Sequence, residues 1–340
     1  MLTAAFTDFE LQFKKPARTS RGVMTSKRGY LLNICRDQDS TNCGVGECSP
    51  LVGLSCDDKP EYREALKEVC RNINLPLSEL LSRYTDWPSI MFGVESALLD
   101  LANGGRGILF KSDFTRGLQP IPINGLIWMG SYDSMLSQIK EKLTDGFKVI
   151  KIKVGAIDFD AEIGLLKHIR KQFSADEITI RLDANGAFDP DTALQKLEML
   201  AKYDIHSIEQ PIRAGNPEKM RFICSNSPIP IALDEELIGV NSDMQRLQLL
   251  TEIKPQYIIL KPSLVGGFTI CNRWIDLCRE TNTGFWITSA LESNIGLNAI
   301  AQYTATLDTA DMAQGLGTGG LFTNNFPSGL VVRRGHLYFE

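Results

Sequence analysis

The chain has 340 residues, which suggests about two domains, and 43% of its residues are hydrophobic, enough for a sizeable core. Its 36 basic and 41 acidic side chains give a formal net charge of −5 without a basic run, so a nucleic-acid partner is not expected. No apolar run approaches the roughly 20 residues of a membrane span, so no membrane association is expected either.

The N-terminal residues 1–13 alternate apolar and polar side chains, which predicts a strand and not a secretory signal peptide. We therefore expect a cytoplasmic protein with reduced thiols. The eight cysteines include no CxxC pair and fit no zinc-binding spacing, so we interpret them as structural or inert. Only three histidines occur, which leaves Lys, Asp or Glu as the expected general base.

Short strands and helices alternate in the first 105 residues. We predict a strand at 30–37, a helix at 60–73, and an apolar helix at 88–104 that two glycines end. Two segments rich in Gly, Ser and Thr, 17–29 and 40–55, are predicted as loops, and both are candidates for a mobile lid.

From about residue 121, short β-branched runs alternate with helical patterns such as 160–173. The runs lie at 121–128, 148–155, 177–185, 205–211, 230–236, 257–264, 284–293 and, more weakly, 311–318. Eight strands at intervals of roughly 25–30 residues are typical of a (β/α)₈ barrel, although an open doubly wound sheet gives the same local pattern. The tail 328–340 is predicted as an edge hairpin or strand that returns toward the N-terminal region.

Charged residues fall on one face of five successive predicted strands. In the run 148–155, Ile150 and Ile152 share the face expected to meet the helices, so Lys151 and Lys153 point inward. The same alternation turns one further charge inward at each of the next four strands. These five residues are Lys153, Asp183, Glu209, Asp234 and Lys261, at separations of 30, 26, 25 and 27 residues.

Inward charges inside a barrel cost several kcal/mol each unless they pair or bind something. Three carboxylates from neighbouring strands suit a hard cation such as Mg²⁺, with a lysine on either side. A desolvated lysine near a divalent cation has a lowered pKa and can serve as a general base. Each motif alone is more often a solvated strand end or a turn, but their common order and spacing favour a site.

These motifs resemble the enolase superfamily, specifically its muconate-lactonizing subgroup. The matching stretches are KIK at 151–153, DAN at 183–185, IEQP at 208–211, LDE at 233–235 and LKP at 260–262. The resemblance covers nearly the whole chain. It implies an α/β fold, a modified (β/α)₈ barrel at 111–319 that carries the active site, and an α+β capping domain at 1–110 that about 320–340 completes.

The resemblance assigns roles residue by residue. It implies that Lys153 and Lys261 are the catalytic acid/base pair. Asp183, Glu209 and Asp234 are then the ligands of Mg²⁺, for which Mn²⁺ is a potential substitute. The substrate contacts that we expect are Lys151, Asn185, Ser289, Glu292, Gly317 and Thr318.

Finer similarity, at 44–55, 261–268 and 288–297, is to the o-succinylbenzoate synthases of menaquinone biosynthesis. It implies a lyase that dehydrates a small carboxylate, 2-succinyl-6-hydroxy-2,4-cyclohexadiene-1-carboxylate. The alternative is an N-acylamino acid racemase or dipeptide epimerase of the same superfamily. Dipeptide epimerases typically carry a DxD motif near the eighth strand, and the stretch 315–322 has no acid, which argues against dipeptide substrates. The sequence leaves the oligomeric state open.

Overall fold

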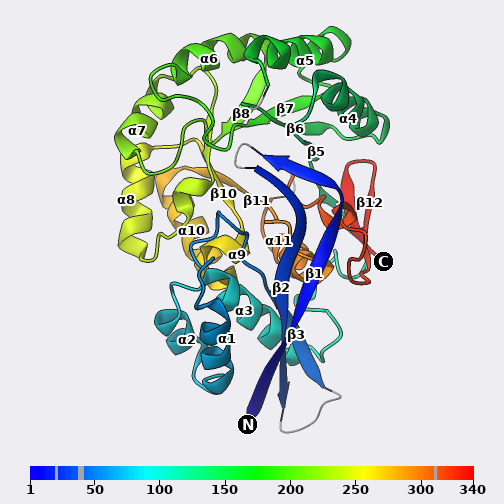
Figure 1. Ribbon diagram of the computed structural model, residues 1–340, viewed down its shortest axis with the longest axis vertical. Coiled ribbons are helices and arrows are strands. Elements are labelled where there is room, and N and C mark those ends of the chain that lie inside the picture. The colour runs from blue at the N-terminus through cyan, green and yellow to red at the C-terminus, as the bar shows by residue number, and fades with distance from the viewer. Residues whose placement is uncertain (20–21, 37–41, 156, 310–311) are drawn as a thin grey trace.

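The structure of the chain is a computed structural model that describes residues 1–19, 22–36, 42–155, 157–309 and 312–340 (Figure 1). Its N-terminal part holds an antiparallel sheet with the strand order β1-β2-β3. The strands are β1 (Leu2–Thr19), β2 (Gly22–Arg36) and β3 (Cys43–Cys48). Three helices accompany them: α1 (Tyr62–Arg71), α2 (Leu77–Arg83) and α3 (Pro88–Ala102). The helices predicted at 60–73 and 88–104 are thus confirmed.

Helix α3 is the central element of this part, because side chains on all its faces are buried. It packs directly on β3 through glycines. A Cβ atom on Gly46 would come within 1.9 Å of the Gly93 carbonyl oxygen, and one on Gly44 within 2.0 Å of the Ala97 carbonyl oxygen. No larger residue allows this approach of strand and helix backbones.

The prediction of a loop at 17–29 is wrong for the described residues of that segment. Residues 17–19 end β1 and residues 22–29 begin β2, with Arg18 opposite Val23 in the antiparallel register. The glycines and serines of this segment favour a loop, but its Thr and Val residues also favour a strand. Pairing between β1 and β2 stabilises the strand conformation. Likewise, residues 43–48 of the second predicted loop form β3.

The expectation of reduced thiols is wrong at one pair, because Cys35 and Cys43 form a disulfide. They are cross-strand partners in the β2–β3 register, and their Cα atoms lie 4.2 Å apart. Zinc-type spacing does not reveal such a pair, because the hairpin register and not the sequence separation brings the two sulfurs together.

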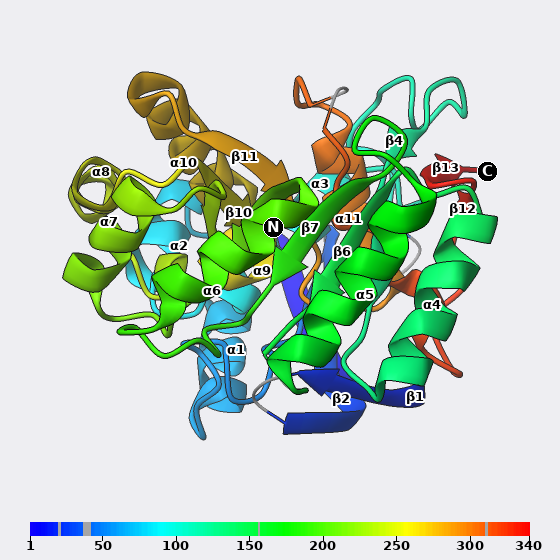
Figure 2. The ribbon, with the colours of Figure 1, turned by 90° about the horizontal axis from the view of Figure 1, so that it is seen from above.

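The second part is a ring of parallel strands with helices on its outside, an α/β barrel fold whose outline is visible in Figure 1 and whose strands Figure 2 shows from the side. Seven strands follow the order β11-β10-β9-β8-β7-β6-β5. They are β5 (Gly125–Ile127), β6 (Val149–Lys153), β7 (Thr179–Asp183), β8 (Ile205–Glu209), β9 (Ile231–Leu233), β10 (Tyr257–Leu260) and β11 (Gly284–Ile287). Each lies within a run predicted as a strand, which confirms seven of the eight.

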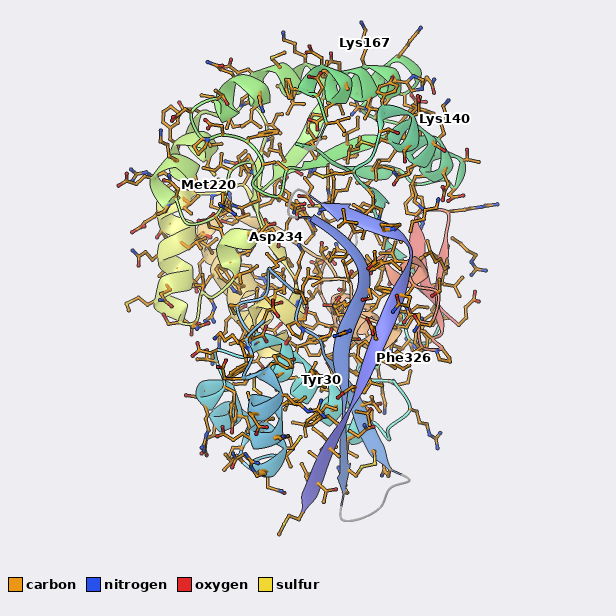
Figure 3. All side chains as sticks on the ribbon, in the orientation of Figure 1. Tyr30, Lys140, Lys167, Met220, Asp234 and Phe326 are labelled. Carbon is orange, nitrogen blue, oxygen red and sulfur yellow. A yellow bond between two sulfur atoms is a disulfide. The ribbon has the colours of Figure 1, made fainter. Side chains whose placement is uncertain are left out.

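Helices on the outside of the ring cover the apolar faces of these strands. They are α4 (Tyr132–Thr144), α5 (Phe159–Gln172), α6 (Ala193–Leu200), α7 (Pro217–Asn226), α8 (Asp243–Ile253), the short α9 (Pro262–Val265), α10 (Gly267–Thr281) and α11 (Asn294–Thr304). Lys140 and Lys167 extend outward from α4 and α5, whereas Asp234 lies inside the ring (Figure 3). Among the described residues, no helix is both long and apolar enough to span a membrane.

The ring closes through an extended segment where the eighth strand is predicted. Asp311 of that prediction lies outside the described residues, and residues 312–318 form no regular strand. Yet Gln314 bridges in parallel to Ile123, just before β5, and Gly315 bridges to Thr288, just after β11. A Cβ atom on Gly315 would lie 2.4 Å from Thr288 Oγ1, so glycine permits this close approach.

The C-terminal hairpin confirms the predicted edge hairpin of the tail, but not its predicted return toward the N-terminal region. It consists of β12 (Leu330–Arg333) and β13 (His336–Phe339), and β13 pairs with β4 (Ile121–Pro122). The tail therefore joins the edge of the barrel. Contact with the N-terminal sheet comes from the preceding segment, where Phe322 bridges to Phe13.

Candidate active site

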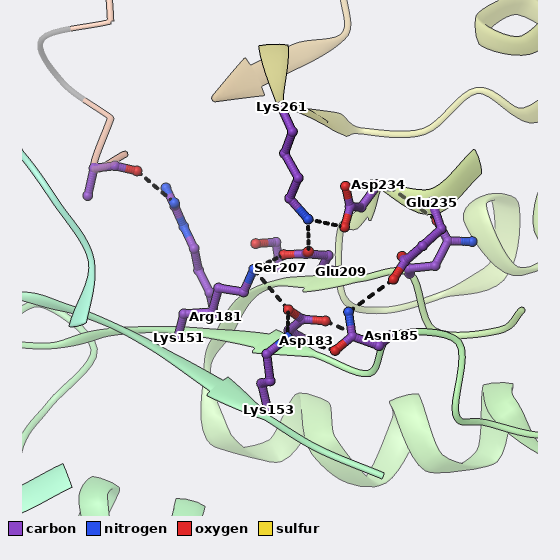
Figure 4. Close-up of polar contacts among 12 residues, drawn as sticks. Lys151, Lys153, Arg181, Asp183, Asn185, Ser207, Glu209, Asp234, Glu235 and Lys261 are labelled. Atoms are coloured by element: carbon purple, nitrogen blue, oxygen red, sulfur yellow. Dashed lines mark hydrogen bonds and ion pairs between the residues drawn. The ribbon is translucent and has the colours of Figure 1, made fainter. Parts of the chain in front are cut away.

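Five charged side chains meet at one end of the barrel (Figure 4). Lys153, Asp183 and Glu209 are the last residues of β6, β7 and β8, and Asp234 and Lys261 directly follow β9 and β10. Because neighbouring parallel strands end at the same edge, a charge at each strand end becomes a ring of charges. The inward direction predicted from strand alternation holds for all five.

The lysines and carboxylates form one connected network. Lys151 Nζ donates to Glu209 Oε2 and lies 2.9 Å from Asp183 Oδ2. Lys153 Nζ donates to Asp183 Oδ2 at 2.8 Å and to Asn185 Oδ1 at 2.6 Å. On the other side, Lys261 Nζ donates to Asp234 Oδ2 and lies 3.7 Å from Glu209 Oε1. Three ammonium groups therefore balance three carboxylates.

Burial and charge shift the pKa values of the ring in different directions. Burial raises the pKa of Glu209 to about 8, and the negative charge of Asp183 adds to the shift. Burial also disfavours the charged form of Asp183, but Lys151 and Lys153 outweigh it and lower its pKa. For Lys151 and Lys261, burial lowers the pKa, yet the carboxylates they contact outweigh it, so both pKa values are raised.

Unusual backbone conformations follow three of the strands. Asn185, Gln210 and Leu291 have φ angles of 44°, 40° and 64°, in the left-handed region that costs non-glycine residues energy. Gln210 is fully buried, and its Oε1 accepts the backbone N–H of Asp234 at 3.2 Å. The predicted EQP motif thus fixes the end of β9 as well as that of β8.

The donor set of this ring fits a hard divalent cation. Asp183, Glu209 and Asp234 are at most 2% exposed, and Glu209 Oε1 accepts no hydrogen bond within the described chain. As the side chains stand, no three His, Cys, Asp or Glu residues among those described are grouped closely enough to hold a metal. The reason is visible in the network, where the Lys151 and Lys261 ammonium groups bridge the carboxylates. A cation would take over their role of compensating buried negative charge.

A pocket opens beside the ring. Most of the predicted substrate contacts line it, namely Lys151, Asn185, Ser289, Gly317 and Thr318. Ser289 Oγ and Thr318 Oγ1 are hydrogen-bonded to each other at 2.7 Å. Apolar side chains from both parts of the chain complete the wall: Met24, Leu51 and Leu54 from the N-terminal part, and Leu126, Trp128, Ala290 and Leu291 from the barrel.

Glu292 is placed differently from the prediction that it contacts substrate. It is fully buried and does not line the cavity. Its Oε1 accepts a hydrogen bond from Ser263 Oγ at 2.5 Å, and its Oε2 accepts one from the Ala290 N–H at 2.7 Å. Its carboxylate is therefore occupied within the protein and supports the wall of the cavity from behind.

Two polar residues that line the cavity were missed by the sequence reasoning. Asn124 and Thr288 are 5% and 9% exposed, and Asn124 Oδ1 and Thr288 Oγ1 have no hydrogen-bond partner in the described chain. They flank Gly315 on the inner wall of the barrel, since Thr288 bridges to Gly315 and the Asn124 N–H donates to the preceding carbonyl of Gln314. Asn124 shares the inward parity of Leu126 and Trp128, a signal that was available in the sequence.

Comparison with known proteins places this site in a family. The family model described as "Enolase C-terminal domain-like" matches residues 134–339, so the chain belongs to the enolase superfamily. A curated o-succinylbenzoate synthase from Desulfotalea psychrophila is 47% identical, with 96% of each chain covered. The crystal structure of MenC from the same organism matches with a TM-score of 0.89 at 43% identity, over 99% of each chain. Within the superfamily, the chain belongs to the family of o-succinylbenzoate synthases.

A more distant structural neighbour shares the fold. The dipeptide epimerase from Enterococcus faecalis, solved with Mg and the dipeptide L-Leu-L-Tyr, matches with a TM-score of 0.84 at 20% identity. The match covers 99% of this chain and 96% of the epimerase.

Proposed function

We propose that the chain catalyses the Mg²⁺-dependent dehydration of 2-succinyl-6-hydroxy-2,4-cyclohexadiene-1-carboxylate to o-succinylbenzoate, a lyase reaction of menaquinone biosynthesis. The observation that carries the proposal is the network at the barrel mouth, in which Lys153 and Lys261 reach three buried carboxylates from different strands. The 47% identity to a curated o-succinylbenzoate synthase supports the choice of substrate.

In this proposal Asp183, Glu209 and Asp234 hold the cation, with Mn²⁺ as a potential substitute for Mg²⁺. When bound, the cation supplies positive charge next to the substrate carboxylate and so favours loss of the proton α to it. Burial, and after it the negative charge of Asp183, raises the pKa of Glu209 to about 8. A cation at that position would stabilise the charged carboxylate, which supports the proposed ligand set.

Lys153 is the proposed base. In its neutral form it takes the proton from the ring carbon that carries the carboxylate, and the electron pair left behind forms the new ring double bond. The hydroxyl on the neighbouring carbon departs with a proton from Lys153, which releases water, restores the lysine and leaves an aromatic ring. Trp128, whose ring centroid lies 5.9 Å from Lys153 Nζ, limits the access of water to this ammonium group.

Lys261 is proposed to act through its charge. Asp234 and Glu209 raise its pKa above the usual lysine value against the effect of burial, so it stays an ammonium group at neutral pH. A fixed cation facing the substrate stabilises the negative charge that develops when the α-proton leaves.

The remaining cavity residues are proposed to orient the substrate. The succinyl end meets Ser289, Thr318 and the neighbouring Gly317, and Asn124 and Thr288 offer hydrogen bonds that the protein itself leaves unused. Lys151 and Asn185 complete the polar side of the cavity. Filling unused donors and acceptors with substrate is favourable because a buried unpaired polar group costs about 1–3 kcal/mol.

We further propose that residues 1–110, completed by about 320–340, act as a capping domain over a catalytic barrel at 111–319. The support is the shared cavity, because Met24 and Leu51 from the N-terminal part lie in one wall with Leu291 from the barrel. These three side chains belong to one apolar cluster that also contains Leu11 and Phe322.

An N-acylamino acid racemase is the second candidate, because lysines on two sides of the carboxylates would allow proton exchange on either face of a substrate. Incubation in D₂O with Mg²⁺ separates the two functions. A synthase forms o-succinylbenzoate, detected by mass spectrometry, from the hydroxycyclohexadiene. A racemase incorporates deuterium at the α-carbon of both enantiomers of an N-succinylamino acid. Absence of o-succinylbenzoate together with such exchange would replace the first proposal by the second.

A further inference from the structure

The cavity wall formed by Ser289, Ala290 and Leu291 is held in an unfavourable backbone conformation. All three residues line the cavity, and Leu291 has a φ angle of 64°. The left-handed conformation is unfavourable for a non-glycine residue, so it persists only where neighbouring groups fix it. The wall therefore needs an external restraint.

Both polar groups of Ala290 are restrained by buried charged side chains. Its N–H donates to Glu292 Oε2 at 2.7 Å, and its carbonyl oxygen accepts a hydrogen bond from Lys27 Nζ at 2.9 Å. Lys27 is on β2, in the other part of the molecule, and is only 4% exposed. A lysine from the N-terminal sheet thus reaches through the interior to one carbonyl of the active-site wall.

Two buried glutamates act on the charge of Lys27. Burial lowers the pKa of Lys27, and the negative charges of Glu292 and Glu47, which are both fully buried, offset part of this shift. Glu47 is itself fixed at the start of α11, where it accepts the Ser293 and Gly296 N–H groups, each at 3.0 Å. The two glutamates compensate part of the cost of taking this lysine out of water. The hydrogen bond from the buried Lys27 Nζ restrains the Ala290 carbonyl and the loop that carries it.

The strand that carries Lys27 also carries part of the cavity. Met24, three residues earlier on β2, lines it, and Met24 and Leu291 pack in one apolar cluster. A shift of β2 relative to the barrel would therefore move Met24 and release Ala290 at the same time.

We propose that Lys27 is a positioning residue: from β2 it fixes the Ala290 peptide and so sets the shape of the Ser289–Leu291 wall against which the substrate lies. This rests on the proposed function only for the identity of the substrate. Lys27 contacts neither the metal carboxylates nor the cavity, so it acts on substrate placement and not on the metal or on proton transfer.

The test compares Lys27→Met, which keeps the length and loses the charge, with Lys27→Arg, which keeps a buried cation and donor. Arg28→Met is the matched control, since Arg28 is the next residue on the same strand with an 81% exposed side chain. Each variant is loaded with Mg²⁺ and examined for steady-state kinetics, Mg²⁺ affinity and hydrogen exchange of the peptide that spans 289–291. Should Lys27→Met not fold, Lys27→Gln takes its place with the same expectations.

We expect Lys27→Met to lower kcat/KM about 10-fold or more, mainly through KM, because misplacement of a substrate wall by a fraction of an ångström is costly. Exchange at 289–291 becomes faster, Mg²⁺ affinity changes less than about twofold, and Lys27→Arg recovers most of both losses. Unchanged exchange at 289–291 overturns the proposal, as does faster exchange with kcat/KM equal to that of Arg28→Met. If the wild-type protein forms no o-succinylbenzoate, the proposed function falls, and the exchange rates alone decide whether Lys27 holds the wall.

Discussion

At the scale of single residues, the lysines at the barrel mouth contact the same carboxylates that a metal ion would bind. Lys151, Lys153 and Lys261 carry three positive charges beside the three carboxylates. A divalent cation on those carboxylates competes directly with the ammonium groups that now contact them.

Asp183 is the carboxylate that both Lys151 and Lys153 approach, at 2.9 and 2.8 Å. Asp183→Asn keeps the shape of the side chain but removes its charge, so we expect Mg²⁺ affinity and activity to fall together by about 10-fold or more. Isothermal titration with Mg²⁺ in the absence of substrate measures the first effect. An unchanged Mg²⁺ affinity would remove Asp183 from the proposed ligand set.

Thr288 offers a sharper test of substrate orientation, because valine nearly matches threonine in shape. Thr288→Val removes the unused hydroxyl in the cavity, and we expect KM to rise about 10-fold with little change in kcat, as for a lost hydrogen bond to a charged group. Thr304→Val, at a buried hydroxyl that bonds to the Ile300 carbonyl within α11, is the control. Equal KM values for the two variants would show that Thr288 makes no contact with the substrate.

Strand alternation and spacing were enough to predict the five charged residues of the ring, because each stands at a strand end where position along the chain determines direction. Lys27 is a single polar residue without a motif, and only the fold brings it to the wall of the cavity. The position of Glu292 behind the cavity wall was likewise not predictable, because it depends on where the fold places Ser263 and Ala290.

At the scale of elements, the barrel strands were predictable, and so were the strands at 1–13 and 30–37 of the N-terminal hairpin, whereas the part of the hairpin at 17–29 was not. The β-branched runs of the barrel are buried on both faces and carry a strong local signal, as in 148–155. The end of β1 and the start of β2 form because the two strands pair, and composition does not reveal this pairing. A segment with the composition of 17–29 can form either a loop or a pair of strands. The disulfide between Cys35 and Cys43 also depends on the pairing of two strands, β2 and β3, which composition does not reveal.

Helix α3 has a buried acidic cap that should make its stability depend on pH. Asp57 Oδ2 accepts the Ser89 N–H at 2.9 Å and Ser89 Oγ at 2.7 Å at the start of the helix, and burial raises the pKa of Asp57 to about 6. The unfolded carboxyl has its ordinary pKa near 4, so the native state binds the proton more tightly. The contribution of Asp57 to the free energy of unfolding is therefore fully present at low pH, and it is lost as pH rises through 6.

The corresponding prediction concerns Asp57→Asn, which cannot titrate. The difference in unfolding free energy between wild type and variant should fall by about 3 kcal/mol between pH 4 and pH 7, following about 2 pKa units at 1.36 kcal/mol each. Urea denaturation of both proteins across this range measures it. A difference that stays constant with pH would mean that Asp57 titrates normally in the folded protein.

At the scale of the whole molecule, the barrel and the N-terminal sheet are joined by specific polar and apolar contacts around the cavity. Gly44, Gly46 and Gly93 allow β3 to pack against α3, and β3 carries Glu47 to the start of α11. Lys27 and Leu51 make the corresponding connections to the cavity wall. In this arrangement, apolar side chains from the N-terminal part of the chain line one side of the cavity beside the strand ends.

The central claim is that Lys153 removes the α-proton in an enzyme that makes o-succinylbenzoate, and one comparison tests it directly. Wild type and Lys153→Ala are saturated with Mg²⁺, and single-turnover formation of o-succinylbenzoate from the hydroxycyclohexadiene is followed for each. We predict conversion by the wild type and a rate lower by about 10³-fold or more for Lys153→Ala, with Mg²⁺ affinity preserved. A Lys153→Ala protein that keeps more than about a tenth of the wild-type rate would contradict the account.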